Sequence, residues 1–285
     1  MPHPTLRIGR IAYLNVWPLF TLLAPVIAAI PGVDCVSGHP SELNAALGRG
    51  EIDVAPASAF AYLANPEGFA LLPDLSISAA VAPIQSVLLV SPVPVDELGE
   101  YLRRTENTVL LSQASASSNA LLQVLWRFHW KLPEVAWTMT APGTGLATDR
   151  PFVEIGDTAL SYYLDPPANR HIIDLGEAWH AFTGLPFVFA AWIVREGLGR
   201  TRERVLSEVW RSLMDIKAGL AHRLEALVEN GARPDWIGAV ALADYLRGVS
   251  YDLGPDRQAS LLLFGHHCRE LGLLDAVPGL RWQAV

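Results

Sequence analysis

The chain has 285 residues, of which 51% are hydrophobic and 18% are charged, and its formal net charge is -8. This balance can bury a substantial core, fits about two domains of ordinary size and excludes a disordered protein. The negative charge gives no general attraction to nucleic acid or to an anionic membrane, so neither is an expected partner.

The first 55 residues alternate between strand-like and helix-like segments. Strands are predicted at Leu6–Leu14, Val33–Ser37 and Ile52–Ala55. Helices are predicted at Leu19–Ile30 and Ser41–Leu47, with Ser41 as a helix cap. This β-α-β-α-β order is typical of a parallel sheet with crossover helices, and therefore of an α/β fold.

Two strongly apolar strands, at Ser86–Val90 and Pro186–Val194, divide the remaining sequence. We expect the chain to pass into a second lobe at residues 91–94 and to return along the later strand. The predicted discontinuous lobe therefore comprises residues 1–90 and 190–285, and the inserted lobe comprises residues 91–189. Two lobes joined by paired crossings predict a ligand cleft between them.

The inserted segment carries further α/β signals, and the C-terminal segment is wholly helical. The expected strands of the inserted segment are Thr108–Leu111 and Phe152–Ile155, and its expected helices are Asp96–Arg104, Asn119–Trp130 and Asp157–Tyr163. Amphipathic helices are predicted at Arg200–Glu229, Pro234–Arg247 and Pro255–Leu271. The helical tail is a candidate surface for a homodimer.

The N-terminal residues show no basic segment followed by an apolar run, so we expect a cytoplasmic protein. The uncharged stretch at residues 75–95 contains prolines and serines and does not predict a membrane span. Cys35 and Cys268 sit in no paired motif and are expected to be buried or half-buried free thiols. No dinucleotide, P-loop or zinc motif is present, so no cofactor or metal is expected.

An ordered set of short motifs resembles one family. It includes Gly9–Asn15, Gly50–Ala55 with Ser58, Leu72–Ser78, Gln85–Leu89, the serines of residues 112–118, Ile155–Asp157 and Thr183–Ala190. These motifs are similar to those of the chorismate dehydratases of the futalosine route to menaquinone. The resemblance covers about residues 7–195 and implies a type II periplasmic-binding-protein-like fold. It also implies a lyase that dehydrates chorismate to 3-[(1-carboxyvinyl)oxy]benzoate.

Two residues are predicted to act directly in catalysis. Asn15 follows the first strand, at the edge where α/β sheets place ligands, and its amide can donate to a carboxylate or to a departing hydroxyl. The alternative role is to cap a turn. Ser86 begins the crossing strand and could bond a ligand carboxylate, although a strand-end serine can also be satisfied by backbone.

The predicted substrate-binding residues are mostly hydroxyl or amide side chains near helix starts. A helix start with added hydroxyls can cradle a carboxylate in an acidic protein, whereas ordinary capping needs only one serine. Ser58 and Asp157 could instead cap helices, and His180 could be a surface histidine. The full predicted set is Ser58, Ser112, Ser115, Ser117, Ser118, Asn119, Asp157 and His180.

Few candidate bases stand in these motifs, which suggests that a substrate carboxylate removes the proton. Two alternatives to the lyase remain. One is a solute-binding or sensor protein for small carboxylates, because the fold is shared with such proteins. The other is the sister futalosine-pathway enzyme, which the Tyr13-Leu14-Asn15 motif disfavours.

Overall fold

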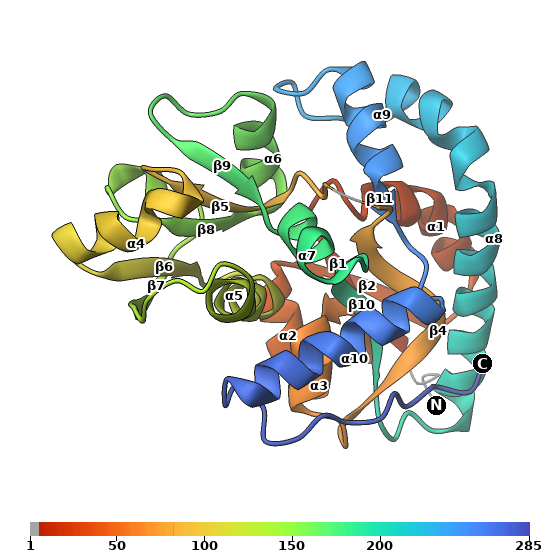
Figure 1. The fold of residues 1–285 in the computed structure, drawn as a ribbon. Helices are drawn as coiled ribbons and strands as arrows, with labels where there is room; N and C mark the ends of the chain where they lie inside the picture. The colour runs from red at the N-terminus through yellow and green to blue at the C-terminus, as the bar shows by residue number, and fades with distance from the viewer. Residues whose placement is uncertain (1–5, 82) are drawn as a thin grey trace.

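The computed structural model describes residues 6–81 and 83–285 and contains two β-sheets that lie side by side with helices around them (Figure 1). The first sheet has six strands in the order β11-β4-β10-β3-β1-β2. The second sheet has five strands in the order β7-β6-β8-β5-β9. The predicted two-lobed α/β architecture is therefore confirmed.

The first lobe begins with the predicted alternation of strands and helices. Its elements are β1 (Leu6–Ile11), α1 (Trp17–Ala29), β2 (Val33–Gly38), α2 (Pro40–Gly48), β3 (Val54–Ser58), α3 (Ala59–Ala64) and β4 (Phe69–Ala79). Strand β1 pairs in parallel with β2 and β3, as crossover helices require. Ser41 does not cap α2, because the helix begins earlier and the backbone N–H of His39 donates to the Glu42 carboxylate (2.9 Å).

Strand β4 was not predicted as one element. Pro73 and Asp74 interrupt its run of buried residues, and Asp74 has a left-handed backbone with φ of 58°. The strand continues past this irregularity because it pairs antiparallel with β10, with register shifts along the ladder. Bulges of this kind bend a strand without ending it.

The crossings between the lobes lie elsewhere than predicted. Strand β5 (Val87–Ser91) pairs with β8 and β9 of the second sheet, so the chain leaves the first sheet before β5 and not at residues 91–94. A buried apolar strand fits the centre of either sheet equally well, and its sequence does not distinguish them. We propose a discontinuous lobe and an inserted lobe whose boundaries lie near residues 80–86 and 184–187.

The second lobe is built around β5. Its further elements are α4 (Val95–Arg104), β6 (Thr108–Ser112), α5 (Ala116–Val124), the π-helix η1 (Leu125–His129), β7 (Ala136–Thr140), the short 3₁₀ helix η2 (Gly145–Ala147), β8 (Phe152–Ile155), α6 (Gly156–Leu164), β9 (His171–Asp174) and α7 (Leu175–Thr183). The helix expected at residues 119–130 is thus α5 followed by η1. It starts three residues earlier, because Ser115 caps it.

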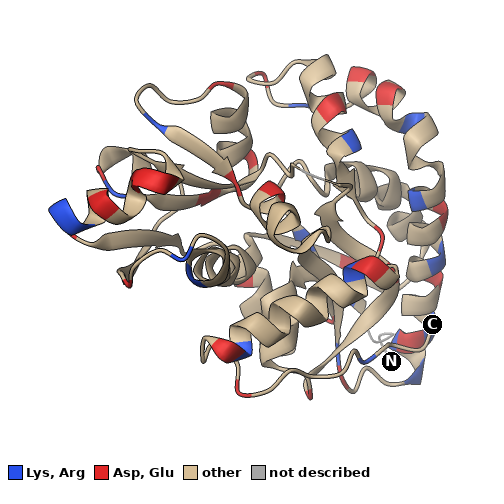
Figure 2. Cartoon of the chain, viewed as in Figure 1, with Lys and Arg blue, Asp and Glu red and all other residues tan. Residues whose placement is uncertain are grey.

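The chain returns along β10 (Val188–Arg195) and ends in the predicted helical segment. That segment contains α8 (Arg200–Asn230), α9 (Ala239–Gly248), the short strand β11 (Val249–Ser250) and α10 (Pro255–Glu270). Helix α8 runs along the outside of the first lobe, and Figure 2 shows acidic and basic residues interspersed along it. Its opposite face is apolar and buried, which is the pattern of a surface helix packed on a core.

Asp53 of the motif Gly50–Ala55 and the two cysteines lie in structural surroundings. Asp53 is buried, pairs with Arg195 (2.7 Å) and Arg202 (3.3 Å), and so is not available to a ligand. Cys35 and Cys268 are both free thiols, as predicted. Cys268 is buried, but Cys35 is exposed, because β2 is an edge strand with little covering it.

Candidate functional site

A pocket lies between the two sheets, at the place where the sequence predicts a ligand cleft. Its volume is about 500 Å³ when the open space at its mouth is included. Both lobes contribute to its lining: Ile11, Tyr13, Asn15, Pro40, Ser58, Ile77, Ser86, Val87, Ser115, Ser118, Ile155, Gly156, Phe189 and Ala190. Five of the ten predicted site residues therefore meet in one cavity.

Asn15 lies in the turn between β1 and α1 and lines the pocket. The Oδ1 atom of its side chain is buried and has no hydrogen-bond partner among the described residues. Its backbone carbonyl is held separately, by the Tyr251 hydroxyl (2.7 Å). A buried polar atom without a partner is costly and calls for an explanation, and a bound ligand would supply the missing partner.

Ser86 precedes β5 on the crossing between the lobes and also lines the pocket. Its side chain is 2% exposed, and its hydroxyl oxygen accepts a hydrogen bond from Tyr245 (2.9 Å). Among the described residues, the one further hydrogen bond of this hydroxyl is a long one, which it donates to the carbonyl of Ile84 (3.5 Å). The hydroxyl proton of Ser86 is therefore only weakly engaged and can be donated to a ligand instead.

The serines before α5 divide between two roles. Ser115 caps α5 by accepting from the Ser118 backbone N–H (3.2 Å), and the two hydroxyls lie 2.7 Å apart beside the pocket. Ser117 points instead to Ser58 across the lobe boundary, with 2.8 Å between their hydroxyls, and also accepts from the Phe60 backbone N–H (3.1 Å). Only Ser115 and Ser118 of this run line the pocket.

Ser112 and Asn119 lie behind the pocket and bond to each other. The Asn119 amide accepts from the backbone N–H of Ser112 (2.9 Å) and donates to its carbonyl (2.8 Å). The Ser112 hydroxyl accepts from the backbone N–H of Ala114 (3.3 Å). This pair fixes the end of β6 against α5, so both residues support the loop that presents Ser115.

Ser58 and Asp157 each connect the two lobes. Ser58 caps α3 by accepting from the Ala61 N–H (3.2 Å), as its alternative role predicted, and it lines the pocket as well. Asp157 does not cap α6, because that helix already begins at Gly156. Its carboxylate accepts from the backbone N–H of Leu14 (3.0 Å) in the other lobe. These two residues thus join the lobes by hydrogen bonds, between Ser58 and Ser117 and between Leu14 and Asp157.

His180 lies on α7 and is not among the residues that line the pocket. Phe187, which stands in the motif Thr183–Ala190, does not line the pocket either. Phe187 is fully buried and packs against Trp179 and Phe264 with ring centroids 5.3 and 4.9 Å apart. Phe189, two residues later and within β10, lines the pocket instead.

The pocket has a largely apolar lining with several hydroxyl and amide groups and no charged side chain among the described residues. Among the described residues that line it, none has an Asp, Glu, His, Lys or Arg side chain. Burial raises the pKa of Tyr13 to about 12, and the nearby carboxylates of Asp157 and Glu154 add to this effect, so the phenol stays protonated at neutral pH. The pocket therefore offers hydroxyl, phenol and amide donors and no ionised base.

A glycine brings α6 close to this phenol. Gly156 has a left-handed backbone with φ of 66°, and a Cβ atom there would come within 2.7 Å of the Tyr13 ring. Only glycine fits such a position without strain. The sequence singled out Gly156 in a motif, but the contact with Tyr13 joins residues 143 positions apart and could not be seen there.

We expect Asp157→Asn and Asp157→Ala variants to separate the charge of this side chain from its hydrogen bond. Asparagine keeps an acceptor for the Leu14 N–H, whereas alanine leaves that N–H unsatisfied and should lower the free energy of unfolding by roughly 1–3 kcal/mol. Burial raises the pKa of Asp157 above its usual 3.8, so the ionised form costs stability as pH rises through the folded-state pKa. Relative to the parent chain, Asp157→Asn should gain stability from pH 4 upward.

Urea unfolding of the three chains at pH 4, 5 and 7 measures both effects. The difference between the parent chain and Asp157→Asn is the quantity to follow, because burial also raises the pKa values of Glu154 and Asp174, which titrate in all three chains. A difference that stays constant over this pH range would contradict the assignment.

Comparison with known proteins gives one family and one fold. A family model described as menaquinone biosynthesis matches residues 6–270. A chorismate dehydratase of Thermus thermophilus is 29% identical, and the match covers 84% of this chain and 94% of that protein.

Solved structures extend the comparison at the level of fold. A structure from Archaeoglobus fulgidus superposes with a TM-score of 0.72 at 13% identity, covering 95% of this chain and 98% of that one. The periplasmic aliphatic sulphonate binding protein of Escherichia coli superposes with a TM-score of 0.67 at 15% identity, covering 100% and 94% of the two chains. These likenesses confirm the predicted periplasmic-binding-protein-like fold.

Proposed function

This chain belongs to the menaquinone biosynthesis family, and from that premise we propose that it is a chorismate dehydratase, a lyase that converts chorismate to 3-[(1-carboxyvinyl)oxy]benzoate. The reaction removes the proton from C3 and the hydroxyl from C4, so one water leaves and a C3–C4 double bond forms. The ring becomes aromatic, which makes the overall change strongly downhill. The protein must therefore orient the substrate and stabilise the departing groups, without supplying a thermodynamic drive.

The observation that best supports this mechanism is the uncharged lining of the pocket. No carboxylate or imidazole lines it among the described residues, yet a proton must leave C3. We propose that one of the substrate's own carboxylates accepts this proton. Fixed donors favour such an intramolecular transfer, because they hold the reacting atoms of the substrate in place.

The donors of the pocket suggest a role for each residue. Asn15 would donate its amide N–H to the hydroxyl that leaves C4, while its unpartnered Oδ1 would accept from the substrate. Ser86 would donate to a substrate carboxylate. Ser115 and Ser118, at the start of α5, would hold the second carboxylate together with the helix dipole.

A solute-binding or sensor protein is the second candidate, because the superposed structures include a periplasmic binding protein. That likeness concerns the fold alone. Within residues 6–81 and 83–285, no helix has both the length and the apolar character needed to cross a membrane. We propose that the chain acts in the cytoplasm on chorismate. We also keep a homodimer through the helical tail as a proposal, which light scattering of the purified protein tests.

The test is to incubate the chelator-treated protein with chorismate and to follow the products by liquid chromatography with mass detection. Loss of one water with retention of the enolpyruvyl ether is the expected result. Tight binding of chorismate without turnover would favour the binding-protein candidate or the sister enzyme. Absence of both binding and turnover would overturn chorismate as the ligand.

A further inference from the structure

Two tyrosines of the C-terminal segment reach the residues proposed to act on the substrate. The Tyr245 hydroxyl, on α9, donates to Ser86 Oγ (2.9 Å), and the Tyr251 hydroxyl donates to the backbone carbonyl of Asn15 (2.7 Å). Both side chains are buried, with 2% and 5% of their surfaces exposed. Neither tyrosine lines the pocket, so each acts on the site only through its partner.

In the hydrogen bond between Tyr245 and Ser86, it matters for the chemistry that Tyr245 is the donor. A serine hydroxyl has one proton and two lone pairs, so a bond received from Tyr245 occupies a lone pair and leaves the proton available. Burial raises the pKa of Tyr245 and of Tyr251, so both phenols remain donors across the working pH range. Ser86 is thereby held as a donor toward the pocket, which is the form that a carboxylate ligand requires.

The hydrogen bond from Tyr251 fixes the main chain of Asn15 and does not engage its side chain. Tyr251 holds the carbonyl of Asn15, while the Oδ1 atom of the same residue remains without a partner among the described residues. The backbone of Tyr251 is itself fixed, because its carbonyl accepts from the Ser76 N–H (2.9 Å). The turn that presents the Asn15 amide is therefore tied through Tyr251 to β4.

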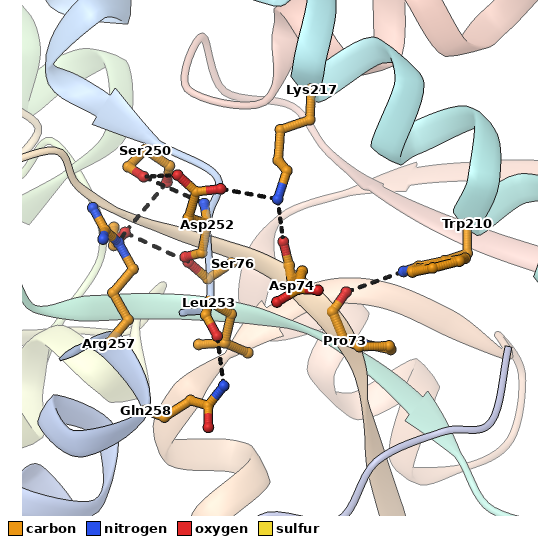
Figure 3. Close-up of polar contacts among 11 residues, drawn as sticks. Pro73, Asp74, Ser76, Trp210, Lys217, Ser250, Asp252, Leu253, Arg257 and Gln258 are labelled. Atoms are coloured by element: carbon orange, nitrogen blue, oxygen red, sulfur yellow. Dashed lines mark hydrogen bonds and ion pairs between the residues drawn. The ribbon is translucent and has the colours of Figure 1, made fainter. Parts of the chain in front are cut away.

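The segment that carries these tyrosines is firmly attached to β4 (Figure 3). Strand β11 pairs with the end of β4, and the Arg257 guanidinium donates to the Ser78 hydroxyl (2.8 Å). Lys217 of α8 contacts the Asp252 carboxylate (2.9 Å) and donates to the carbonyl of Asp74 (2.8 Å). Figure 3 shows these side chains converging on the stretch around Asp252, from α8 on one side and α10 on the other.

We propose that Tyr245 and Tyr251 are positioning residues for Ser86 and Asn15, and that the C-terminal helical segment is thereby an integral part of the active site. This inference rests on the proposed dehydration of chorismate. It extends the site beyond residues 7–195, where the sequence motifs end. Positioning of this kind raises kcat, because small displacements of a donor weaken its contact in the transition state.

The test compares Tyr245→Phe and Tyr251→Phe with Tyr62→Phe as a matched control. Tyr62 is also fully buried, and its hydroxyl also bonds to the C-terminal segment. It donates to the carbonyl of Gly279 (3.3 Å) and accepts from the Arg281 N–H (2.7 Å), but it does not line the pocket, and neither bond reaches a predicted site residue. Each site variant should lower kcat by about tenfold or more with KM changed by less than about threefold, whereas Tyr62→Phe should retain kcat.

A double-mutant cycle shows whether Tyr245 acts through Ser86. In a Ser86→Ala background, Tyr245→Phe should lower kcat by less than about twofold, because the group it positions is gone. An equal loss in both backgrounds, or kcat retained in Tyr245→Phe and Tyr251→Phe, would overturn the proposal.

Amide hydrogen exchange gives a second readout that needs no turnover. Tyr245→Phe should raise exchange in peptides that span residues 84–88, and Tyr251→Phe should raise it in peptides that span residues 12–17, with no such change in Tyr62→Phe. If the parent chain does not convert chorismate, the proposed function fails, and this exchange pattern still decides whether the tyrosines hold these segments. Unchanged or uniformly raised exchange would overturn the positioning role.

Discussion

Asn15→Ala is expected to lower kcat for chorismate dehydration by about 100-fold or more while changing KM by less than about tenfold. The Asn15 side chain is the one pocket-lining group with a buried polar atom that lacks a partner among the described residues. Its amide would contact the hydroxyl that departs from C4, where negative charge develops as the bond breaks. Loss of a donor at such a position costs about 100- to 1,000-fold in rate.

Two further variants sharpen this prediction. Asn15→Asp keeps the size of the side chain but adds a negative charge to a pocket that must hold a dianion, so it should raise KM and lower kcat together. Ser118→Ala removes one of two neighbouring hydroxyls and should cost less, about tenfold in kcat/KM. Turnover by Asn15→Ala within about threefold of the parent chain would remove Asn15 from the mechanism. Turnover abolished in Asp157→Asn with binding intact would instead argue for a protein base.

The sequence was sufficient for the architecture but misplaced the crossings between the lobes. The alternation of strands and helices in residues 6–58 predicts a parallel sheet correctly, because each helix there is long enough for one crossover. Strand β5 was assigned to the first lobe, since its five apolar or small residues are equally compatible with either sheet. Strand β4 was missed because its irregularity at Pro73 and Asp74 looks like a turn.

For the site too, local motifs predict some residues, whereas residues that depend on long-range contacts are missed. Asn15, Ser58, Ser86, Ser115 and Ser118 stand in short motifs, and the structure brings all five to one pocket. Tyr245 and Tyr251 stand in no motif, and their partners lie 159 and 236 residues away. Contacts at such separations depend on how the tail docks on β4, which no local pattern records.

Asp174→Ala is expected to lower the free energy of unfolding by about 3 kcal/mol and kcat by about tenfold. Asp174 is 4% exposed and caps α7 by accepting from the Glu177 N–H (2.9 Å). The same carboxylate accepts from the N–H groups of Ile84 (3.2 Å) and Gln85 (2.6 Å) on the crossing between the lobes. Alanine would leave all three donors without this acceptor. Removal of the buried charge offsets part of the loss, because burial raises the pKa of Asp174.

The expected loss of kcat in Asp174→Ala arises because Asp174 holds the backbone of Gln85, which directly precedes Ser86. Gln85 has a left-handed backbone with φ of 66°, and its bond to Asp174 helps to hold this uncommon conformation directly before Ser86. Asp174→Ser separates the two roles, since a serine can still cap α7 but cannot reach both N–H groups of the crossing. We expect Asp174→Ser to recover about 1 kcal/mol of stability in urea unfolding and none of the lost kcat. Recovery of kcat together with stability would show that Asp174 supports α7 alone and that Ser86 keeps its position without it.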